Sequence, residues 1–181
     1  WKMGTAGALT LLPEHPDRAC IVMNGDVLTR VNWQHLLDFH DAHHAQATIC
    51  VKEYHFQVPY GVIKTDQHRL AGIDEKPVHH FFVNAGIYVL EPEIFKDIPS
   101  GKEFDFSKNL FPLLLKKGAP LYGYVASGYW SDIGNLEQYR QAHYDLLAGK
   151  INLPLPGEEV EPGIRVEEGA WLHPEAKLKA P

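Results

Sequence analysis

The sequence predicts an α/β fold built on a doubly wound, mixed and mostly parallel sheet, and two observations support that prediction. Apolar runs typical of buried strands alternate with segments whose apolar residues recur every three or four positions, as expected for βα units. Three further strand-like runs follow one another with only short polar turns between them. These three runs indicate an antiparallel insert beside the parallel strands.

Each predicted helix combines apolar spacing with a residue that begins or ends it. Pro13 ends the first helix-forming run, Asn32 is suited to cap the second helix, and Gly149 follows the last one. The predicted helices cover residues 5–12, 33–46, 92–98, 106–117 and 135–147.

Each predicted strand is a short apolar or alternating run bounded by turn residues. The predicted strands cover residues 18–23, 47–54, 61–64, 69–74, 81–90 and 121–126. A helix separates the first two strands, which favours a right-handed crossover connection. We therefore expect residues 20–23 and 49–51 to lie in parallel neighbouring strands.

The composition changes beyond Pro154, where proline, glycine and glutamate dominate. Aliphatic residues recur there at intervals of six: Val160, Val166, Leu172 and Leu178. A period of six is typical of a parallel β-helix, and the alternative is a proline-rich linker with chance periodicity. We expect a main domain over residues 1–150, a linker over residues 151–156 and the beginning of a hexapeptide-repeat β-helix over residues 157–181.

The composition of the 181 residues argues against several classes of protein. A hydrophobic content of 45% suits one ordinary core, and a net charge of -6 argues against a nonspecific grip on nucleic acid. The apolar stretches are far shorter than the ~20 residues that cross a bilayer, and the first residues show no secretory signal. Cys20 and Cys50 both fall in predicted strands, so we expect reduced thiols and a cytoplasmic protein.

Two aspartates beside glycines are the strongest candidates for chemistry. Asp26 follows an apolar run in Asn24-Gly25-Asp26, and Asp132 lies between Trp130 and Ile133. If the two carboxylates converge, they are suited to hold a divalent cation against phosphate oxygens. The alternatives are an ordinary turn at Asp26 and a helix cap at Asp132.

Three further short motifs combine a polar side chain with a glycine or a proline. In Glu75-Lys76-Pro77 the lysine is suited to meet a phosphate and the glutamate to accept sugar hydroxyls, although a solvated turn is the alternative. In the other two motifs, Tyr60 precedes Gly61 and Asn84 precedes Gly86. Each glycine allows a ligand to approach the backbone closely beside a polar side chain.

The eleven histidines give weaker signals. His40, His43 and His44 have helical spacing, but no acidic or thiol ligand joins them in register, so we expect an exposed or half-buried helix face instead of a zinc site. No Ser-His-Asp order or Gly-x-Ser-x-Gly turn supports acyl transfer.

Taken together, Gly4-Thr5-Ala6-Gly7 and the motifs that contain Asp26, Gly61, Lys76, Asn84 and Asp132 occur in an order that resembles the sugar-1-phosphate nucleotidyltransferases. The subgroup of closest resemblance, the mannose-1-phosphate guanylyltransferases and similar enzymes, transfers a guanylyl group to mannose 1-phosphate or to a related heptose phosphate. The resemblance covers nearly the whole chain. It implies an incomplete, Rossmann-like fold of the nucleotide-diphospho-sugar transferase type, followed by the start of a left-handed β-helix. The motifs that carry it are Gly4-Thr5-Ala6-Gly7, Asn24-Gly25-Asp26, Pro59-Tyr60-Gly61-Val62, Glu75-Lys76-Pro77, Val83-Asn84-Ala85-Gly86 and Trp130-Ser131-Asp132-Ile133-Gly134.

The resemblance also implies roles for particular residues. Asp26 and Asp132 are implied to bind Mg²⁺ and, with Lys76, to act in catalysis. The residues implied to bind substrate are Gly4 and Thr5 along the nucleotide, together with Tyr60, Gly61, Glu75, Lys76, Asn84 and Trp130.

The implied reaction joins a nucleoside triphosphate, GTP by resemblance, to a sugar 1-phosphate, mannose 1-phosphate by resemblance. A phosphate oxygen of the sugar attacks the α-phosphorus in line, pyrophosphate leaves, and no covalent enzyme intermediate is needed. A β-helix tail in this family implies a homo-oligomer for a full-length protein.

The sequence departs from the family pattern in one respect. The family opens with a strand and a glycine-rich loop bearing a basic residue, and nothing before Gly4 supplies them. We therefore expect an N-terminally truncated chain that is inactive alone. The rival interpretations are a non-catalytic regulatory subunit of the same fold that binds a nucleotide sugar, and a generic α/β carbohydrate-binding domain without metal dependence.

Overall fold

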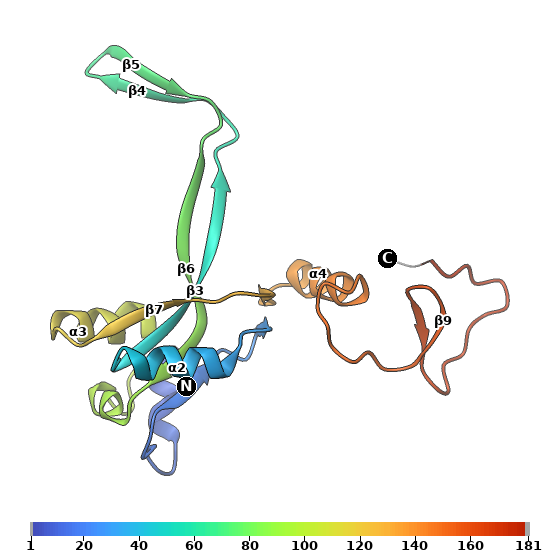
Figure 1. Cartoon of the computed structure of the whole chain (residues 1–181), viewed down its shortest axis with the longest axis horizontal. Coiled ribbons are helices and arrows are strands. Elements are labelled where there is room, and N and C mark those ends of the chain that lie inside the picture. Colours follow the sequence, from blue (N-terminus) through green and yellow to red (C-terminus); the bar gives the residue numbers. More distant parts are fainter. Residues whose placement is uncertain (1, 180–181) are drawn as a thin grey trace. The chain divides into compact units, whose positions relative to one another are not determined.

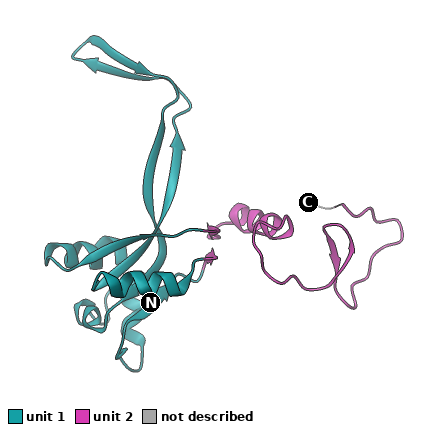
Figure 2. Ribbon diagram, viewed as in Figure 1, with its two compact units in different colours: residues 1–25, 31–127 teal, residues 26–30, 128–181 magenta. Residues whose placement is uncertain are grey.

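The computed structural model describes residues 2–179, which divide into two compact units. Unit 1 contains residues 1–25 and 31–127, and unit 2 contains residues 26–30 and 128–181 (Figure 2). Within the described residues, no helix is both long and apolar enough to cross a membrane.

Unit 1 is built on a mixed four-stranded sheet in the order β1-β6-β3-β7. Strands β3 and β7 pair in parallel, whereas β6 is antiparallel to both β1 and β3. The bounds of the strands are Cys20–Met23 for β1, Ala47–Gln57 for β3, Val78–Leu90 for β6 and Leu121–Val125 for β7. The prediction of a mixed α/β sheet is confirmed, but two of the three strand pairings in this sheet are antiparallel, so the pairing is not mostly parallel as predicted.

The prediction that β1 and β3 are neighbours is wrong, because β6 lies between them. The reason is visible in the burial of β6: every residue from Ala85 to Leu90 is buried. A continuous buried run must be covered on both faces and flanked on both edges, so it occupies the centre of the sheet. Strands β1 and β3 therefore run in the same direction without touching.

Helical segments cover both faces of this sheet. On one face, Phe106, Leu110 and Leu114 pack with Tyr88 and Leu90 of β6 in the main apolar cluster. On the other face, helix α2 buries Leu36 and His40. The helical segments of unit 1 are α1 (Gly4–Gly7), η1 (Ala8–Leu11), α2 (Trp33–Ala42), η2 (Pro92–Asp97), η3 (Phe106–Leu110) and α3 (Phe111–Lys116).

Helix α2 ends at Ala42, four residues before the predicted end at 46. His44 adopts a left-handed backbone with φ 47°, and its amide donates to the carbonyl of Asp41. A left-handed residue just beyond the last turn is a common way to end a helix. Asn32 caps the beginning as predicted, since its side chain accepts from the amide of His35.

Strands β3 and β6 continue beyond the sheet as a two-stranded ribbon, and a second hairpin follows at its far end (Figure 1). This hairpin pairs β4 (Val62–Asp66) with β5 (Arg69–Asp74) in antiparallel fashion. The predicted antiparallel insert is confirmed in this segment. Its side chains are mostly exposed.

Unit 2 begins with the short antiparallel pair of β2 (Val27–Thr29) and β8 (Trp130–Asp132). Helix α4 (Leu136–Leu147) follows, and it is Asn135, not Asp132, whose side chain caps its first turn. Strands β9 (Glu158–Glu161) and β10 (Ile164–Val166) then form an antiparallel hairpin, and residues 167–179 contain turns but no strand. A parallel β-helix is not confirmed in this part of the chain.

Candidate functional site

The β2–β8 pair brings the two candidate aspartates together within unit 2. Asp26 directly precedes β2, Asp132 is the last residue of β8, and Val27 lies opposite Asp132 in the pairing register. The backbone amide of Ile133 donates to the carbonyl oxygen of Asp26 at 2.8 Å. Residues more than one hundred positions apart in sequence are thereby fixed side by side.

The carboxylates of both aspartates reach toward Gly134. A Cβ atom placed on Gly134 would lie 3.0 Å from Oδ1 of Asp132 and 3.6 Å from Oδ2 of Asp26. The amide of Gly134 also donates to Oδ1 of Asp132 at 3.0 Å. Because glycine has no side chain, the space between the two carboxylates stays open at this point.

The donor set of this space suits a hard divalent cation. Both aspartates are exposed, and carboxylate oxygens are the ligands that Mg²⁺ and Ca²⁺ prefer. Mg²⁺ in particular is usually held by one or two carboxylates, with water and phosphate oxygens completing its shell. The residues present therefore fit a magnesium-type site, in which Asp26 and Asp132 would be the protein ligands.

Trp130, predicted to bind substrate, lies on β8 opposite Thr29 and is half-buried. It is two residues from Asp132 along the strand, so the two side chains point to the same side of the β2–β8 pair.

A charged cluster around Asp145 supports this region and was not predicted. The Asp145 carboxylate accepts hydrogen bonds from Lys150, Gln141 and the hydroxyl of Tyr129, at 2.7, 2.9 and 3.0 Å. The hydrogen bonds from Lys150 and Gln141 hold the pKa of Asp145 below its ordinary value. The sequence contained a signal, since Asp145 lies three positions after the buried Ala142, on the inward face of α4.

Gly4 and Thr5 lie in unit 1 against the segment that leads into η3. Gly4 has φ 72°, and a Cβ atom there would lie 2.6 Å from the carbonyl oxygen of Phe104. The Thr5 amide and hydroxyl both donate to Oδ1 of Asp105, at 3.0 and 3.1 Å. The amide hydrogen bond from Thr5 is the largest cause that lowers the pKa of Asp105.

Asn84 contacts the same segment from the sheet. Its Nδ2 donates to the hydroxyls of Tyr88 and Ser107, both at 3.0 Å, and its Oδ1 accepts from the amide of Gly86 at 2.9 Å. Thr5 accepts from the amide of Phe106. The structure thus brings Thr5 and Asn84 to one place in unit 1, on either side of the start of η3.

The remaining predicted residues lie at the junction between the ribbon and the β4–β5 hairpin. Glu75 Oε2 lies 3.0 Å from the Cβ position of Gly61, so these two residues touch. Lys76 has a left-handed backbone with φ 45°, and Tyr60 is 74% exposed. This group is separate from Asn84, because the seven residues of β6 from Val78 to Asn84 span ~20 Å.

The other candidate groups of the sequence have structural roles. His40 is buried, and its ring nitrogens pair with Thr48 Oγ1 at 2.8 Å and Glu91 Oε1 at 3.1 Å. His43 bonds the carbonyl of Phe39. Cys20 and Cys50 are free thiols, and burial raises the pKa of Cys50 to about 12.

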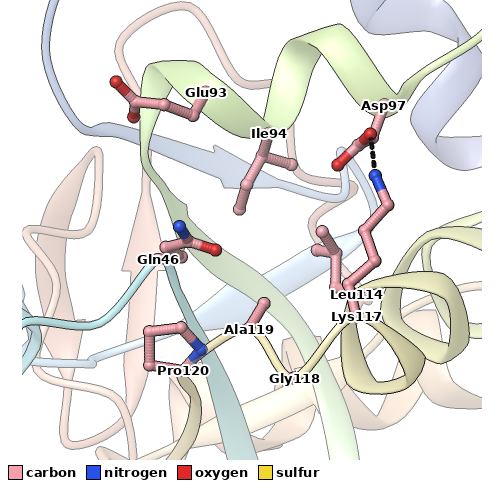
Figure 3. Close-up of a pocket in the computed structure, with 9 residues that line it drawn as sticks. All are labelled: Gln46, Glu93, Ile94, Asp97, Leu114, Lys117, Gly118, Ala119 and Pro120. Carbon is pink, nitrogen blue, oxygen red and sulfur yellow. Dashed lines mark hydrogen bonds and ion pairs between the residues drawn. The ribbon is translucent and has the colours of Figure 1, made fainter.

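A pocket of about 360 Å³ lies in unit 1 beside η2 and α3, away from the predicted site residues (Figure 3). Lys117 and Asp97 form an ion pair across it. Its other lining residues are Gln46, Glu93, Ile94, Leu114, Gly118, Ala119 and Pro120. None of the predicted site residues lines this pocket, so we do not assign it a role in substrate or cation binding.

Comparison with known proteins decides the family. The model of the family described as nucleotidyl transferase matches residues 2–149. The chain belongs to this family. The resemblance to sugar-1-phosphate nucleotidyltransferases is therefore confirmed.

Curated relatives of this member of the nucleotidyl transferase family differ in the substrates that they are named for. A UTP–glucose-1-phosphate uridylyltransferase of Synechocystis is 35% identical over 90% of this chain and 45% of its own length. A mannose-1-phosphate guanylyltransferase of Mycobacterium tuberculosis is 33% identical over 94% of this chain and 50% of its own length. The chain thus spans about half the length of these relatives.

A solved structure shares the fold. HddC from Yersinia pseudotuberculosis superposes with a TM-score of 0.55 and 25% identity, over 81% of this chain and 64% of that one. The likeness agrees with the mixed α/β architecture of unit 1.

Proposed function

We propose that this chain supplies part of a nucleotidyltransferase that joins a nucleoside triphosphate to a sugar 1-phosphate and releases a nucleotide sugar and pyrophosphate. The observation that carries the proposal is the convergence of the Asp26 and Asp132 carboxylates beside Gly134. Membership of the nucleotidyl transferase family supports it. Phosphoryl-group chemistry needs little more from a protein than positioning and charge stabilisation, and a carboxylate pair suits that need.

Asp26 and Asp132 are the residues that would hold the cation, which we propose is Mg²⁺. When bound, a divalent cation neutralises negative charge on phosphate oxygens. The protein's part is to fix its ligands: the Ile133–Asp26 backbone hydrogen bond sets the spacing of the strands, and the Gly134 amide orients one Asp132 oxygen. Such preorganised oxygens need no rearrangement during the reaction.

We propose substrate-binding roles for the predicted residues of unit 1. Lys76 would act as a point charge toward phosphate, and Glu75 beside Gly61 would accept sugar hydroxyls. The left-handed backbone of Lys76 supports its role, because a non-glycine residue in that conformation costs free energy and such residues cluster at functional sites. Gly4, Thr5, Tyr60 and Asn84 remain predicted contributors to nucleotide or sugar binding, as does Trp130 of unit 2.

As the substrate pair we propose GTP and mannose 1-phosphate. The support is the M. tuberculosis relative that is named for this reaction. UTP with glucose 1-phosphate is the pair to test against it, because the Synechocystis relative is named for that one. Self-association of the full-length protein, which the resemblance to a family with a β-helix tail implies, remains part of this proposal.

The test is pyrophosphate release by the full-length protein of which this chain is the proposed part, with Mg²⁺, across GTP, UTP, ATP and dTTP and across mannose and glucose 1-phosphates. Asp26→Asn and Asp132→Asn should each lower the rate at least 100-fold, because each removes one of the two proposed protein ligands of the cation. Asp41→Asn, an exposed aspartate on α2, serves as the matched control and should keep the rate. Product formation that survives both substitutions would contradict the proposal.

A further inference from the structure

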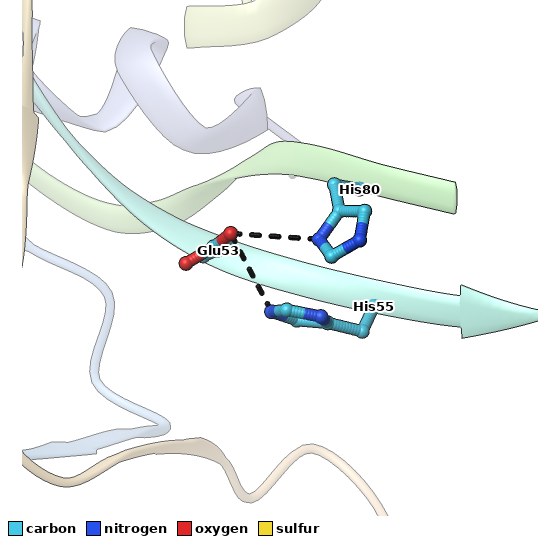
Figure 4. A group of neighbouring side chains, drawn as sticks. All are labelled: Glu53, His55 and His80. Atoms are coloured by element: carbon cyan, nitrogen blue, oxygen red, sulfur yellow. Dashed lines mark ion pairs between the residues drawn. The ribbon is translucent and has the colours of Figure 1, made fainter. Parts of the chain in front are cut away.

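Three metal-ligating side chains meet on one face of the ribbon formed by β3 and β6 (Figure 4). Glu53 and His55 are two residues apart on β3, so their side chains share a face. His80 on β6 lies directly opposite His55 in the pairing register. Among the described residues, these three form the one group of three or more whose ligand atoms all lie within 4.8 Å of one another.

The separations within this group do not correspond to ordinary hydrogen bonds. Nε2 of His55 and Nδ1 of His80 lie 3.5 and 3.6 Å from the same Glu53 oxygen, Oε1. These separations are longer than the 2.7–3.2 Å typical of N–H···O hydrogen bonds. Both imidazoles thus lie at ion-pair distance from one carboxylate oxygen, beyond the length of an ordinary hydrogen bond.

The same separations match the edge of a tetrahedral zinc site. With Zn–N and Zn–O bonds of about 2.0–2.1 Å, neighbouring ligand atoms of a tetrahedron lie about 3.4 Å apart. The two separations that join the imidazoles to Glu53 Oε1, 3.5 and 3.6 Å, are close to that length. The His55 and His80 rings, with centroids 4.4 Å apart and planes 71° apart, are also close enough for both to ligate one ion.

The chemistry of the three ligands indicates a particular kind of metal. Two imidazoles and one carboxylate form a mixed nitrogen and oxygen set, which suits Zn²⁺ and other late first-row divalent ions better than Mg²⁺. The side chains of Glu53, His55 and His80 are 52%, 52% and 58% exposed, so an ion and a water molecule can reach them.

We propose that Glu53, His55 and His80 bind one zinc-type divalent ion, with the fourth position open to water. The ion would join β3 to β6 at a place where the ribbon has no core to hold it, since an isolated two-stranded ribbon is only marginally stable. This site lies in unit 1 and shares no residue with the Asp26–Asp132 pair of unit 2. It is therefore independent of the proposed function.

Calorimetric titration of the chain with ZnCl₂ tests the proposal. One ion should bind at this group, apart from any ion held by the Asp26–Asp132 pair, and His55→Ala, His80→Ala and Glu53→Gln should each weaken its affinity at least tenfold. His79→Ala is the matched control: His79 neighbours His80 on the same strand but pairs with Phe56 on the opposite face, so its loss should leave the affinity unchanged. MgCl₂ should give no comparable binding at these residues.

Hydrogen exchange supplies a second readout that does not depend on any enzymatic activity. Zn²⁺ should slow exchange at the amides of residues 53–57 and 78–82 in the unmodified chain and in His79→Ala, but not in His80→Ala. The substituted side chains are exposed, so the variants should keep the fold, which circular dichroism checks. Absence of stoichiometric zinc binding, or an equal loss of affinity in His79→Ala, would overturn the proposal.

Discussion

The carbonyl oxygen of Asp26 accepts the amide hydrogen of Ile133 at 2.8 Å, so the residue that follows Asp132 is bonded directly to Asp26. The spacing of the two carboxylates is therefore set by the backbone of the β2–β8 pair. A cation site built in this way does not depend on long flexible side chains, whose ordering costs conformational entropy. Local changes at this pair should affect cation affinity more than overall stability.

Gly134→Ala is the sharpest local change. The added methyl group would lie 3.0 Å from Oδ1 of Asp132 and 3.6 Å from Oδ2 of Asp26, inside the space proposed for the cation. Affinity for Mn²⁺, used as a spectroscopic substitute for Mg²⁺, should fall at least tenfold in a titration. Gly25→Ala is the matched control, because it adds the same methyl beside Asp26 with nothing within 4 Å. An equal loss of affinity in both variants would argue against the proposed position of the cation.

The Asp145 cluster should make stability depend on pH in the acidic range. The pKa of Asp145 is lowered in the fold, chiefly by the hydrogen bonds from Lys150 and Gln141. The unfolded chain, with an ordinary value of about 3.9, binds the proton more readily, so the stabilisation is complete above about pH 4 and is lost as pH falls through the lower folded value.

Asp145→Asn tests this pH dependence. The variant should unfold at a lower urea concentration than the parent chain at pH 7, and the difference should shrink as the pH falls below about 4. Intrinsic fluorescence gives the midpoints. A difference that is the same at pH 7 and pH 3 would show that the charge of Asp145 does not contribute.

His40→Ala should destabilise unit 1 by about 2–4 kcal/mol, because it opens a cavity and leaves the buried Thr48 hydroxyl without its imidazole partner. Urea unfolding measures the change. His35→Ala lies on the exposed side of the same helix and should change stability by no more than about 0.5 kcal/mol. Similar losses in the two variants would contradict a structural role for His40.

A pair of glycine substitutions separates backbone strain from crowding. Gly4 and Gly101 have nearly equal φ values, 72° and 71°, but only Gly4 has backbone atoms within 3 Å of its Cβ position. Gly101→Ala should cost about 1–2 kcal/mol for the left-handed conformation alone. Gly4→Ala should cost clearly more, because Phe104 must move. Thermal unfolding compares the two, and equal shifts in Tm would contradict the close packing of Gly4 on Phe104.

The sequence predicted those elements whose signals are local. Asn32 marked the start of α2 correctly, because a capping side chain acts within three residues of its own position. The start of α4 was also predicted, but its cap is Asn135 and not Asp132, which was the candidate for that role. The order of strands is not a local property. The apolar run that ends at Leu90 showed a buried strand, but only the tertiary packing shows that β6 separates β1 from β3.

The sequence allowed the residues of the candidate site to be proposed, but it did not show how the fold brings them together. Asp26 and Asp132 were identified from motif order, whereas β2 and β8, which bring them together, are three-residue strands too short to give a periodic signal. The group of Glu53, His55 and His80 was not predicted from the sequence, for a related reason. Its existence depends on the register between β3 and β6, and a shift of one residue would move His80 to the other face.

A titration of the isotope-labelled chain with Mn²⁺, followed by paramagnetic broadening of amide signals, tests whether Asp26 and Asp132 share one cation. Signals of residues 26–27 and 132–134 should broaden together at the lowest Mn²⁺ concentrations, and Asp26→Asn and Asp132→Asn should each abolish the effect. If either variant retained the broadening in full, the two carboxylates would not hold a common cation.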